Sequence, residues 1–560
     1  MNGIVERLLE GRGLSGAELE AFLDPSLKRL APSSGLPCVS AAADIMLPFV
    51  RSGRRIVVFA DYDCDGVCAS AILVKTIRRL GGNADAFIPS RFNEGYGMTP
   101  ASVERMLAEH PDVALVVTVD CGITSAAEVR SLRKRGIAVV VTDHHLPPGA
   151  LILPECDALI DPKIPAQNAA ASAIGAADLC GAGVAFFLAS ALVQRAVELG
   201  FYDGGKFAAP LLVLAGLATV VDMVPLLGQN RILAANSLRT FKCAPIGLRE
   251  LLLRAQRHPV DLSSYDYGFM LGPRINAPGR MASALEAYRL IMTEDREEAR
   301  NLAQQVDVRN SERKSVEDGM AALALEQVDM AAIGAAAVVN SEESAEPEKW
   351  HVGVCGIVAS RIMEKCGVPV AVVADGHGSV RAPGGYDVHA ALSVCADLLE
   401  RFGGHKAAGG FSVKEGRFAE FREAFVAACA AQGAAIGGAV AFREPEMWVE
   451  PGDLTMELAE GLKLMEPFGE GNPRPVFGLR GVAFANVNVM GKDGGHAAFR
   501  FADGRIPRAT WWGHGAQAEE LRAHSLGRFD VTFTLEISEW GGDAPHPELR
   551  LCALRKTSPG

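Results

Sequence analysis

Runs of apolar residues in the first half of the chain alternate with amphipathic stretches. The runs at 56–60, 114–119 and 137–141 are rich in Val and Ile, and segments of helical periodicity lie between them. Such alternation is typical of parallel strands that are buried on both faces. The pattern therefore predicts an α/β domain with a parallel sheet over residues 51–235. Its predicted strands are 56–61, 84–89, 114–119 and 137–142, and its predicted helices are 67–80, 100–109 and 124–135.

Two other regions carry helical patterns without strand-like runs. Residues 1–50 predict a helical lead-in, and residues 236–330 predict a mostly helical, charged connector. Within the connector, 295–320 combines helical periodicity with many charges, as an exposed connecting helix would.

The C-terminal part of the chain predicts two further domains. A smaller α/β unit is expected at 331–435, with strands near 335–339, 352–354 and 370–373. Residues 436–560 alternate apolar and polar positions in short runs separated by Gly and Asp, which is typical of a small β-barrel. The predicted fold class is therefore multidomain α/β with a C-terminal barrel.

Length, charge and cysteine usage agree with this organisation. A chain of 560 residues is too long for one hydrophobic core. The net charge of −12 argues against a nonspecific basic coat for nucleic acid, although it permits a locally basic surface. Twelve cysteines lack any Cys-x-x-Cys pair, so reduced thiols in a cytoplasmic protein are expected.

No segment of the sequence predicts membrane targeting. The N-terminus lacks a basic stretch followed by an apolar core, so no signal peptide is expected. The apolar stretches 184–193 and 210–221 are shorter than a bilayer span. We therefore expect a cytoplasmic protein without a membrane partner.

Acidic clusters and two histidines close three of the predicted strands. Asp61-Tyr62-Asp63-Cys64-Asp65-Gly66 follows the first strand, Asp120 follows a second, and Asp143-His144-His145 follows a third. Three carboxylates at alternate positions indicate an extended segment that presents them together. The carboxyl ends of parallel strands meet at one edge of a sheet. Carboxylates gathered there repel one another unless cations neutralise them, so the clusters predict a metal site.

A further acid, Asp222, ends the apolar run 211–221. A buried carboxylate needs a partner, and a cation would serve, whereas the alternative is an acid at the surface end of a helix. Oxygen and imidazole ligands without thiolates suit Mn²⁺ or Mg²⁺. Two such ions about 3.5–4 Å apart are a standard arrangement for attack of water on phosphorus.

Candidate anion-binding residues lie outside the acidic clusters. Gly272–Arg280 is interpreted as a rigid loop that presents arginines, and Arg91 and Tyr96 lie on a glycine-flanked loop. An arginine fork can clamp a phosphate, although lone loop arginines are more often surface residues. The glycines around His405 would allow backbone N–H groups to approach an anion.

Four aromatic residues in the predicted barrel have two interpretations that the sequence leaves open. They could be platforms on which bases stack, or they could form the barrel core. These residues are Phe499, Phe501, Trp511 and Trp512.

The ordered series of motifs resembles the DHH phosphoesterases, specifically the RecJ-type single-stranded-DNA exonucleases. Gly403-Gly404-His405 resembles the glycine-rich motif of the DHHA1 domain in that family, and 466–477 resembles the lead-in to its OB-fold domain. The series in the first domain comprises Asp61-Tyr62-Asp63-Cys64-Asp65-Gly66, Val119-Asp120-Cys121-Gly122, Thr142-Asp143-His144-His145, Val221-Asp222-Met223-Val224-Pro225 and 272–280.

The resemblance implies 5′→3′ degradation of single-stranded DNA to mononucleotides with two Mn²⁺ or Mg²⁺ ions, in recombination and repair. It implies that the metal ligands are Asp61, Asp63, Asp65, Asp120, His144 and Asp222. It implies that the catalytic residues are Asp63, Asp120, His144 and His145. It also implies that Tyr96 contacts a base or sugar of the substrate, and that the substrate phosphates are contacted by Arg91, Arg280, Ser379, Arg381 and His405. It implies a monomer whose partners are single-stranded DNA and, as candidates, a single-strand-binding protein and a RecQ-type helicase.

The sequence departs from the family at three points in the second α/β unit. His351-Val352-Gly353 replaces His-Glu-Gly, Arg381-Ala382 replaces Arg-Ser, and Ala408-Gly409-Gly410 replaces Ala-Ala-Gly. None of these changes removes a predicted metal ligand, so they bear on how that unit holds DNA.

Three alternative functions remain. A phosphodiesterase for short oligonucleotides or cyclic dinucleotides shares the motifs but generally lacks a C-terminal barrel, and the length of this chain argues against a manganese pyrophosphatase. A non-catalytic scaffold for DNA or replication proteins is a different class, and the intact carboxylates and His144 argue against it.

Overall fold

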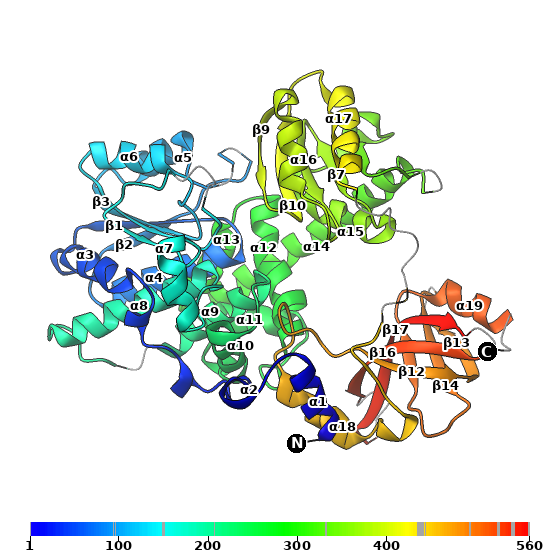
Figure 1. The fold of residues 1–560 in the computed structure, drawn as a ribbon. Helices are drawn as coiled ribbons and strands as arrows, with labels where there is room; N and C mark the ends of the chain where they lie inside the picture. The colour runs from blue at the N-terminus through cyan, green and yellow to red at the C-terminus, as the bar shows by residue number, and fades with distance from the viewer. Residues whose placement is uncertain are drawn as a thin grey trace.

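The structure is a computed structural model that describes most of the chain. The described residues are 2–92, 94–95, 97–147, 152–205, 208–330, 333–433, 442, 444–491, 494–523, 527–538 and 544–557. Tyr96, a predicted substrate contact, lies outside them. Figure 1 shows the N-terminal α/β domain on the left, the second α/β unit above it to the right, and the barrel at the lower right.

The first domain is a parallel five-stranded sheet with helices on both faces, as predicted. Its strand order is β2-β1-β3-β4-β5, and all pairs are parallel. Helices α3, α4 and α8 pack on one face, and α5 and α6 cover the other. The strands are β1 (Arg55–Ala60), β2 (Ala84–Phe87), β3 (Val113–Val119), β4 (Ala138–Thr142) and β5 (Ala158–Ile160), the last of which the sequence pattern missed. The helices are α3 (Val39–Ser52), α4 (Cys64–Arg79), α5 (Pro100–Glu109), α6 (Ala126–Lys134), α7 (Pro165–Ala173) and α8 (Gly181–Glu198).

Helix α4 begins at Cys64, three residues before the predicted start. The Asp63 carboxylate caps it, because Oδ1 accepts hydrogen bonds from the N–H groups of Asp65 (2.9 Å) and Gly66 (3.1 Å). The expectation of three carboxylates on an extended segment was therefore wrong: Asp61 follows the strand, Asp63 caps the helix and Asp65 lies in its first turn.

One described helix, α8, has the length and composition of a membrane span. The apolar stretch in its sequence covers only 184–193, whereas the helix runs over 18 residues. It packs against α3, α4 and α9, and 67% of it is buried inside the protein. In this structure α8 is a core helix of the first domain.

The connector is helical, as predicted, and its last helix is the long α14 (Arg296–Glu326). The interpretation of Gly272–Arg280 as a rigid loop was wrong, because this segment forms helix α12 (Gly272–Met281). Pro273 is tolerated in the first helical turn, and the buried Ile275 and Ala277 hold the helix in the core. The connector also contains α11 (Ile246–Arg254), the π-helix η4 (Asp266–Leu271) and α13 (Leu285–Met292), and it follows α9 (Ala208–Val221) and α10 (Gly228–Arg239).

The second α/β unit contains a mixed five-stranded sheet of order β6-β7-β8-β10-β9. Only β6 and β7 pair in parallel. The predicted strand at 352–354 is instead a short 3₁₀ helix, η7 (Val352–Val354), which leads into α15. The elements are β6 (Ala337–Asn340), α15 (Cys355–Cys366), β7 (Val370–Ala374), β8 (His377–Arg381), α16 (Val388–Val394), β9 (Leu399–Gly404), β10 (Ala408–Val413) and α17 (Phe418–Ala431).

The C-terminal domain contains a seven-stranded sheet of order β11-β12-β16-β17-β15-β14-β13. Phe499, Phe501 and Trp511 are buried in its core, so the core interpretation holds for these three, whereas Trp512 is 53% exposed. The elements are β11 (Met447–Trp448), α18 (Met456–Leu462), β12 (Phe477–Val482), β13 (Phe484–Met490), β14 (His496–Phe501), β15 (Ala509–Trp511), α19 (Gly515–Ala523), β16 (Phe529–Ser538) and β17 (His546–Lys556).

The N-terminal segment joins the barrel to the first domain. Helix α1 (Gly3–Gly11) buries its apolar face in the barrel core, whereas α3 packs on the first sheet. Between them, after α2 (Gly16–Leu23), the buried Arg231 of α10 donates hydrogen bonds to the carbonyls of Phe22 (2.8 Å) and Glu466 (2.9 Å). Its guanidinium lies 3.7 Å from the centre of the Phe22 ring. One buried cation thus fixes three distant segments by their backbones.

Candidate metal centre and phosphate site

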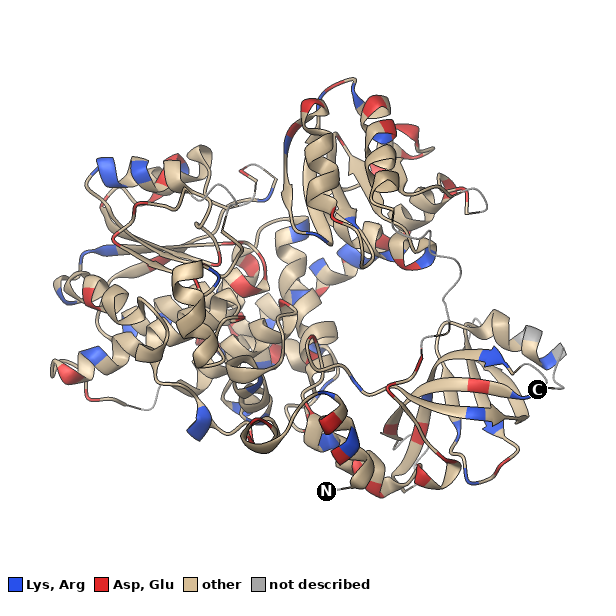
Figure 2. Cartoon of the chain, in the orientation of Figure 1, with Lys and Arg blue, Asp and Glu red and all other residues tan. Residues whose placement is uncertain are grey.

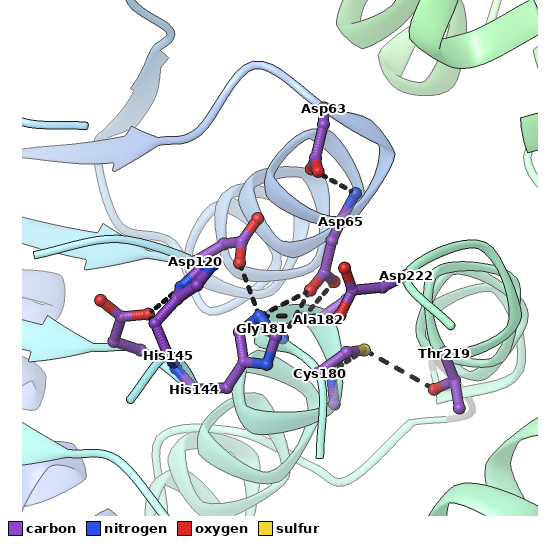
Figure 3. Close-up of polar contacts among 12 residues, drawn as sticks. Asp63, Asp65, Asp120, His144, His145, Cys180, Gly181, Ala182, Thr219 and Asp222 are labelled. Atoms are coloured by element: carbon purple, nitrogen blue, oxygen red, sulfur yellow. Dashed lines mark hydrogen bonds and ion pairs between the residues drawn. The ribbon is translucent and has the colours of Figure 1, made fainter. Parts of the chain in front are cut away.

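Carboxylates and imidazoles from five segments converge at the carboxyl edge of the first sheet (Figure 3). The segments are the ends of β1, β3 and β4, the start of α4 and the end of α9. Asp120 is held with a φ of 60°, which non-glycine residues rarely adopt and which often marks a functional site. The converging side chains are Asp61, Asp63, Asp65, Asp120, His144, His145 and Asp222.

The Nε2 atom of His144 lies at the centre of this cluster. It is 3.1 Å from Oδ1 of Asp120 and 3.7 Å from Oδ2 of both Asp65 and Asp222. Three groups of three side chains could each hold a metal ion, because within each group the ligand atoms lie within 4.8 Å of one another. These groups are Asp61, Asp63 and Asp120; Asp65, His144 and Asp222; and Asp120, His144 and His145.

The protonation states show that these contacts are not ion pairs. Burial, together with the charge of His145, lowers the pKa of His144 to about 3, so its imidazole is neutral at pH 7. Burial and neighbouring carboxylates raise the pKa of Asp61 to about 8 and that of Asp65 to about 7. For the same two reasons the pKa of Asp120 lies well above its ordinary value. The site therefore holds several carboxylates whose ionisation the neighbouring cations and hydrogen-bond donors compensate only in part.

Unpartnered atoms test whether a cation fits this site. Among the described residues, Oδ1 of Asp61, Oδ1 of Asp120 and Nε2 of His144 are buried and lack a hydrogen-bond partner. Buried polar atoms without partners are rare in native proteins. A cation would satisfy all three atoms, because oxygen and imidazole nitrogen are both good ligands of Mn²⁺ and Mg²⁺. The donor set therefore fits divalent metal ions.

The N-terminus of α8 supports the metal centre, a role that was not predicted from the sequence. The N–H groups of Gly181 and Ala182 donate hydrogen bonds of 2.6 and 2.7 Å to the Asp65 carboxylate. A Cβ atom on Gly181 would lie 2.6 Å from the Cβ of Asp120, so only glycine fits there. The sequence signal was the glycine pair that opens this apolar helix, Gly181 and Gly183.

Asp143, a residue not assigned a role from the sequence, orients the two histidines. Its Oδ1 contacts Nδ1 of His145 at 2.7 Å and accepts a 2.8 Å hydrogen bond from the His144 N–H group. Burial opposes the charge of Asp143, but the hydrogen bond to His145 and the charge of His145 hold the pKa of Asp143 below its ordinary value. Burial by itself would lower the pKa of His145, but its hydrogen bond to Asp143 and the charge of Asp143 raise this pKa to about 9. His145 is therefore an oriented imidazolium at pH 7.

Three arginines from separate elements gather beside the metal centre. The guanidinium of Arg91 lies 4.5 Å from the centre of the Tyr62 ring, and Arg280 donates a 3.3 Å hydrogen bond to the Gly353 carbonyl. Burial and then the charges of Arg91 and Arg381 lower the pKa of Arg280 to about 9. Mutually repelling guanidiniums of this kind form a site for an anion.

The second α/β unit completes this anion site. A Cβ atom on Gly356, in the first turn of α15, would lie 2.7 Å from Nη2 of Arg381 and 3.5 Å from Oγ of Ser379. The ring of His405, between β9 and β10, stacks on that of His145 with the centres 6.2 Å apart. The structure thus brings together every predicted site residue that it describes, and their individual roles remain predictions.

The pKa shifts predict how pH affects the stability of the metal-free protein. The folded-state pKa values of Asp61 (about 8) and Asp65 (about 7) are raised above an unfolded value of about 4. Such groups stabilise the fold fully below the unfolded pKa, and this contribution is lost as pH rises through the folded pKa. We expect the melting temperature in a chelator to fall between about pH 5 and about pH 8.5.

Scanning calorimetry across this pH range checks the expectation. Excess Mn²⁺ provides the control, because ions that replace protons on the carboxylates should remove or reverse the decline. A melting temperature that rises with pH in the chelator would contradict the assigned protonation states.

Family models match three parts of the chain. The DHH family N-terminal domain matches residues 55–214, the DHHA1 domain matches 332–431, and the RecJ OB domain matches 446–551. The matches fall on the first domain, the second α/β unit and the barrel.

Individual relatives agree with the family models. The chain is 36% identical over 493 residues to the single-stranded-DNA-specific exonuclease RecJ of Escherichia coli, covering 85% of this chain and 82% of the relative. It is 38% identical over 548 residues to the enzyme of the same name from Thermus thermophilus, covering 95% and 73%.

The fold agrees with solved structures of RecJ. The Thermus thermophilus RecJ structure in complex with Mn²⁺ superposes with a TM-score of 0.81 at 32% identity, covering 99% of this chain and 76% of the other. The structure of that protein with Mg²⁺ gives a TM-score of 0.74 at 30% identity, covering 99% and 75%. On its motifs, fold and relatives, this chain belongs to the RecJ single-stranded-DNA-specific exonucleases of the DHH family.

Proposed function

We propose that this protein is a metal-dependent exonuclease that degrades single-stranded DNA from the 5′ end and releases mononucleotides, in recombination and repair. The observation that carries the proposal is the neutral His144 imidazole among carboxylates, two of which have an unpartnered buried oxygen, beside a cluster of three arginines. A divalent-metal site next to a phosphate site is the constellation that phosphodiester hydrolysis requires.

We propose two Mn²⁺ or Mg²⁺ ions, held by Asp61, Asp63 and Asp120 at one position and by Asp65, His144 and Asp222 at the other. The two groups supporting this division each bring three ligand atoms within 4.8 Å. When bound, such ions lower the pKa of a nucleophilic water and stabilise charge on the phosphoryl oxygens.

The residues of the chain supply the remaining functions. Arg91, Arg280 and Arg381 bind the phosphate and restrict its orientation, as planar guanidinium forks do. The ring of His145, oriented by its contact with Asp143, places an imidazole that can exchange a proton at the same edge of the sheet. His405 brings the second α/β unit against that histidine.

The architecture suits a long single strand as the substrate. The net charge is −12, and Figure 2 shows basic and acidic residues interspersed along α14, so positive charge for binding DNA is confined to local groups such as the arginine cluster. OB-fold domains commonly bind single strands by stacking and backbone contacts. We propose that the barrel holds the part of the strand that extends beyond the metal centre.

Purified protein with Mn²⁺ should degrade single-stranded DNA in preference to duplex DNA, dinucleotides and pyrophosphate. The measurement compares initial rates on 5′- and 3′-labelled strands, where immediate release of the 5′ label indicates the proposed polarity. Faster cleavage of dinucleotides would favour the phosphodiesterase alternative, and no cleavage of any substrate would favour a scaffold.

The proposal also covers the localisation, oligomeric state, partners and domain limits of the protein. We place it in the cytoplasm as a monomer, with a single-strand-binding protein and a RecQ-type helicase as candidate partners. We also retain domain limits of 1–50, 51–235, 236–330, 331–435 and 436–560, with α1 and the barrel sharing one core.

A further inference from the structure

Two aromatic side chains on the π-helix η4 are stacked on each other and exposed. Tyr265 caps the start of η4, and Phe269 lies one turn further along it. Their ring centres are 4.9 Å apart and their planes differ by 21°. Tyr265 is 57% exposed and Phe269 is 67% exposed, so neither contributes to the core. Large apolar groups left in water in this way often mark a binding site.

The metal centre lies on one side of this pair. η4 packs on the end of α9, since a Cβ atom on Gly268 would lie 3.9 Å from Val220 and one on Gly272 would lie 2.6 Å from Val221. Asp222 follows Val221 directly. The residue after it, Met223, is 70% exposed.

The barrel lies on the other side of the pair. The Ser264 hydroxyl, next to Tyr265, donates a hydrogen bond to the carbonyl of Phe468 in the segment that leads to the barrel. The guanidinium of Arg474 lies 4.8 Å from the centre of the Phe468 ring. Arg474 and Arg550 both approach Glu536 of β16, at 3.8 and 2.6 Å. These contacts join the segment that carries Tyr265 to the barrel, where Arg474 and Arg550 lie beside Glu536.

We propose that Tyr265 and Phe269 form a platform on which bases of single-stranded DNA stack between the metal centre and the barrel. This inference rests on the proposed function, because it assigns a binding position to the same substrate. Stacked flat rings beside arginines are how proteins bind single strands without sequence preference. A strand running from the metal centre to the barrel would pass this pair, and that continuity favours DNA over a protein partner.

Kinetics on strands of different length test the platform. Wild type, Tyr265→Ala, Phe269→Ala and the double variant are compared with Mn²⁺ on strands of about 3, 10 and 20 nucleotides. We expect KM for the long strands to rise by about tenfold for each lost stacking position, with a smaller rise as the strand shortens. Val394→Ala, at an exposed apolar position on α16 away from this surface, is the matched control and should match the wild type.

Two further variants separate stacking from other apolar contact. Phe269→Trp should retain the wild-type KM, whereas Phe269→Leu should lose affinity almost as Phe269→Ala does. A strand with 2-aminopurine at successive positions should show fluorescence quenching at one or two positions, and the double variant should abolish it.

The possible results of these experiments distinguish failure of the platform from failure of the proposed function. If the double variant degrades long strands with the wild-type KM, the platform is refuted and the proposed function is unaffected. An equal rise in KM at every strand length, or full rescue by Phe269→Leu, would also overturn it. Failure of the wild type to degrade single-stranded DNA would instead overturn the proposed function.

Discussion

We expect His144→Ala to abolish turnover of single-stranded DNA. The imidazole Nε2 lies within 3.7 Å of carboxylate oxygens of Asp65, Asp120 and Asp222. Its loss removes a ligand at the centre of the site, and metal ions contribute several kcal/mol to such a reaction, so kcat should fall on the order of a thousandfold or more. Single-turnover kinetics with Mn²⁺ measure the loss, and calorimetric titration of Mn²⁺ measures the weakened binding.

Asp63→Asn is the matched variant for the acidic half of the site. Asparagine retains an oxygen that can accept from the N–H groups of Asp65 and Gly66, so α4 keeps its N-cap while the site loses one charge. Asp63→Ala would also lower the free energy of unfolding by about 1 kcal/mol, because the helix cap is lost. The loss of activity could then not be assigned to the metal site alone. Melting temperatures within a few degrees of wild type establish that the variants fold. Substantial activity in both His144→Ala and Asp63→Asn would refute the metal assignment.

Arg280→Gln should strongly reduce the affinity for DNA while leaving the fold as stable as before, or more stable. Burial and the charges of Arg91 and Arg381 lower the pKa of Arg280 to about 9, which shows that its charged form is disfavoured without a ligand. A phosphate relieves that repulsion, so removing the guanidinium costs binding energy and spares the free protein. Loss of a charge-assisted contact of this kind raises KM by about tenfold to a hundredfold.

Arg280→Lys is the control, because it retains the positive charge and removes the fork. If the planar fork matters, lysine should restore only part of the affinity. Substrates with and without a 5′-phosphate show which phosphate the cluster binds. A large fall in melting temperature for Arg280→Gln, or an unchanged KM, would contradict a cluster that is built for an anion.

The alternation of apolar and polar residues was sufficient to predict the first sheet. β1, β3 and β4 begin and end within about one residue of their predicted limits. Strands that are buried on both faces need apolar residues at every position, so the local sequence carries the signal. β5 was missed because it contains only three residues, too few for a pattern.

Segments rich in glycine and proline were predicted less well. Gly272–Arg280 was interpreted as a loop, and 352–354 as a strand, yet both are helical. Glycine often marks a turn, but here Gly272 permits close packing against Val221. Tertiary contacts outweigh local propensity at such positions.

The sequence by itself determined the elements of the first sheet and placed carboxylates and histidines where they end, because both depend on neighbouring residues. Only the tertiary structure decided that Asp222 meets His144, that Gly181 supports Asp65, and that Arg280 and Arg381 face each other across two domains. It also decided that α1 belongs to the barrel core. The physical reason is that burial of apolar faces sets which distant elements pack together, and that packing brings their charged ends to one point.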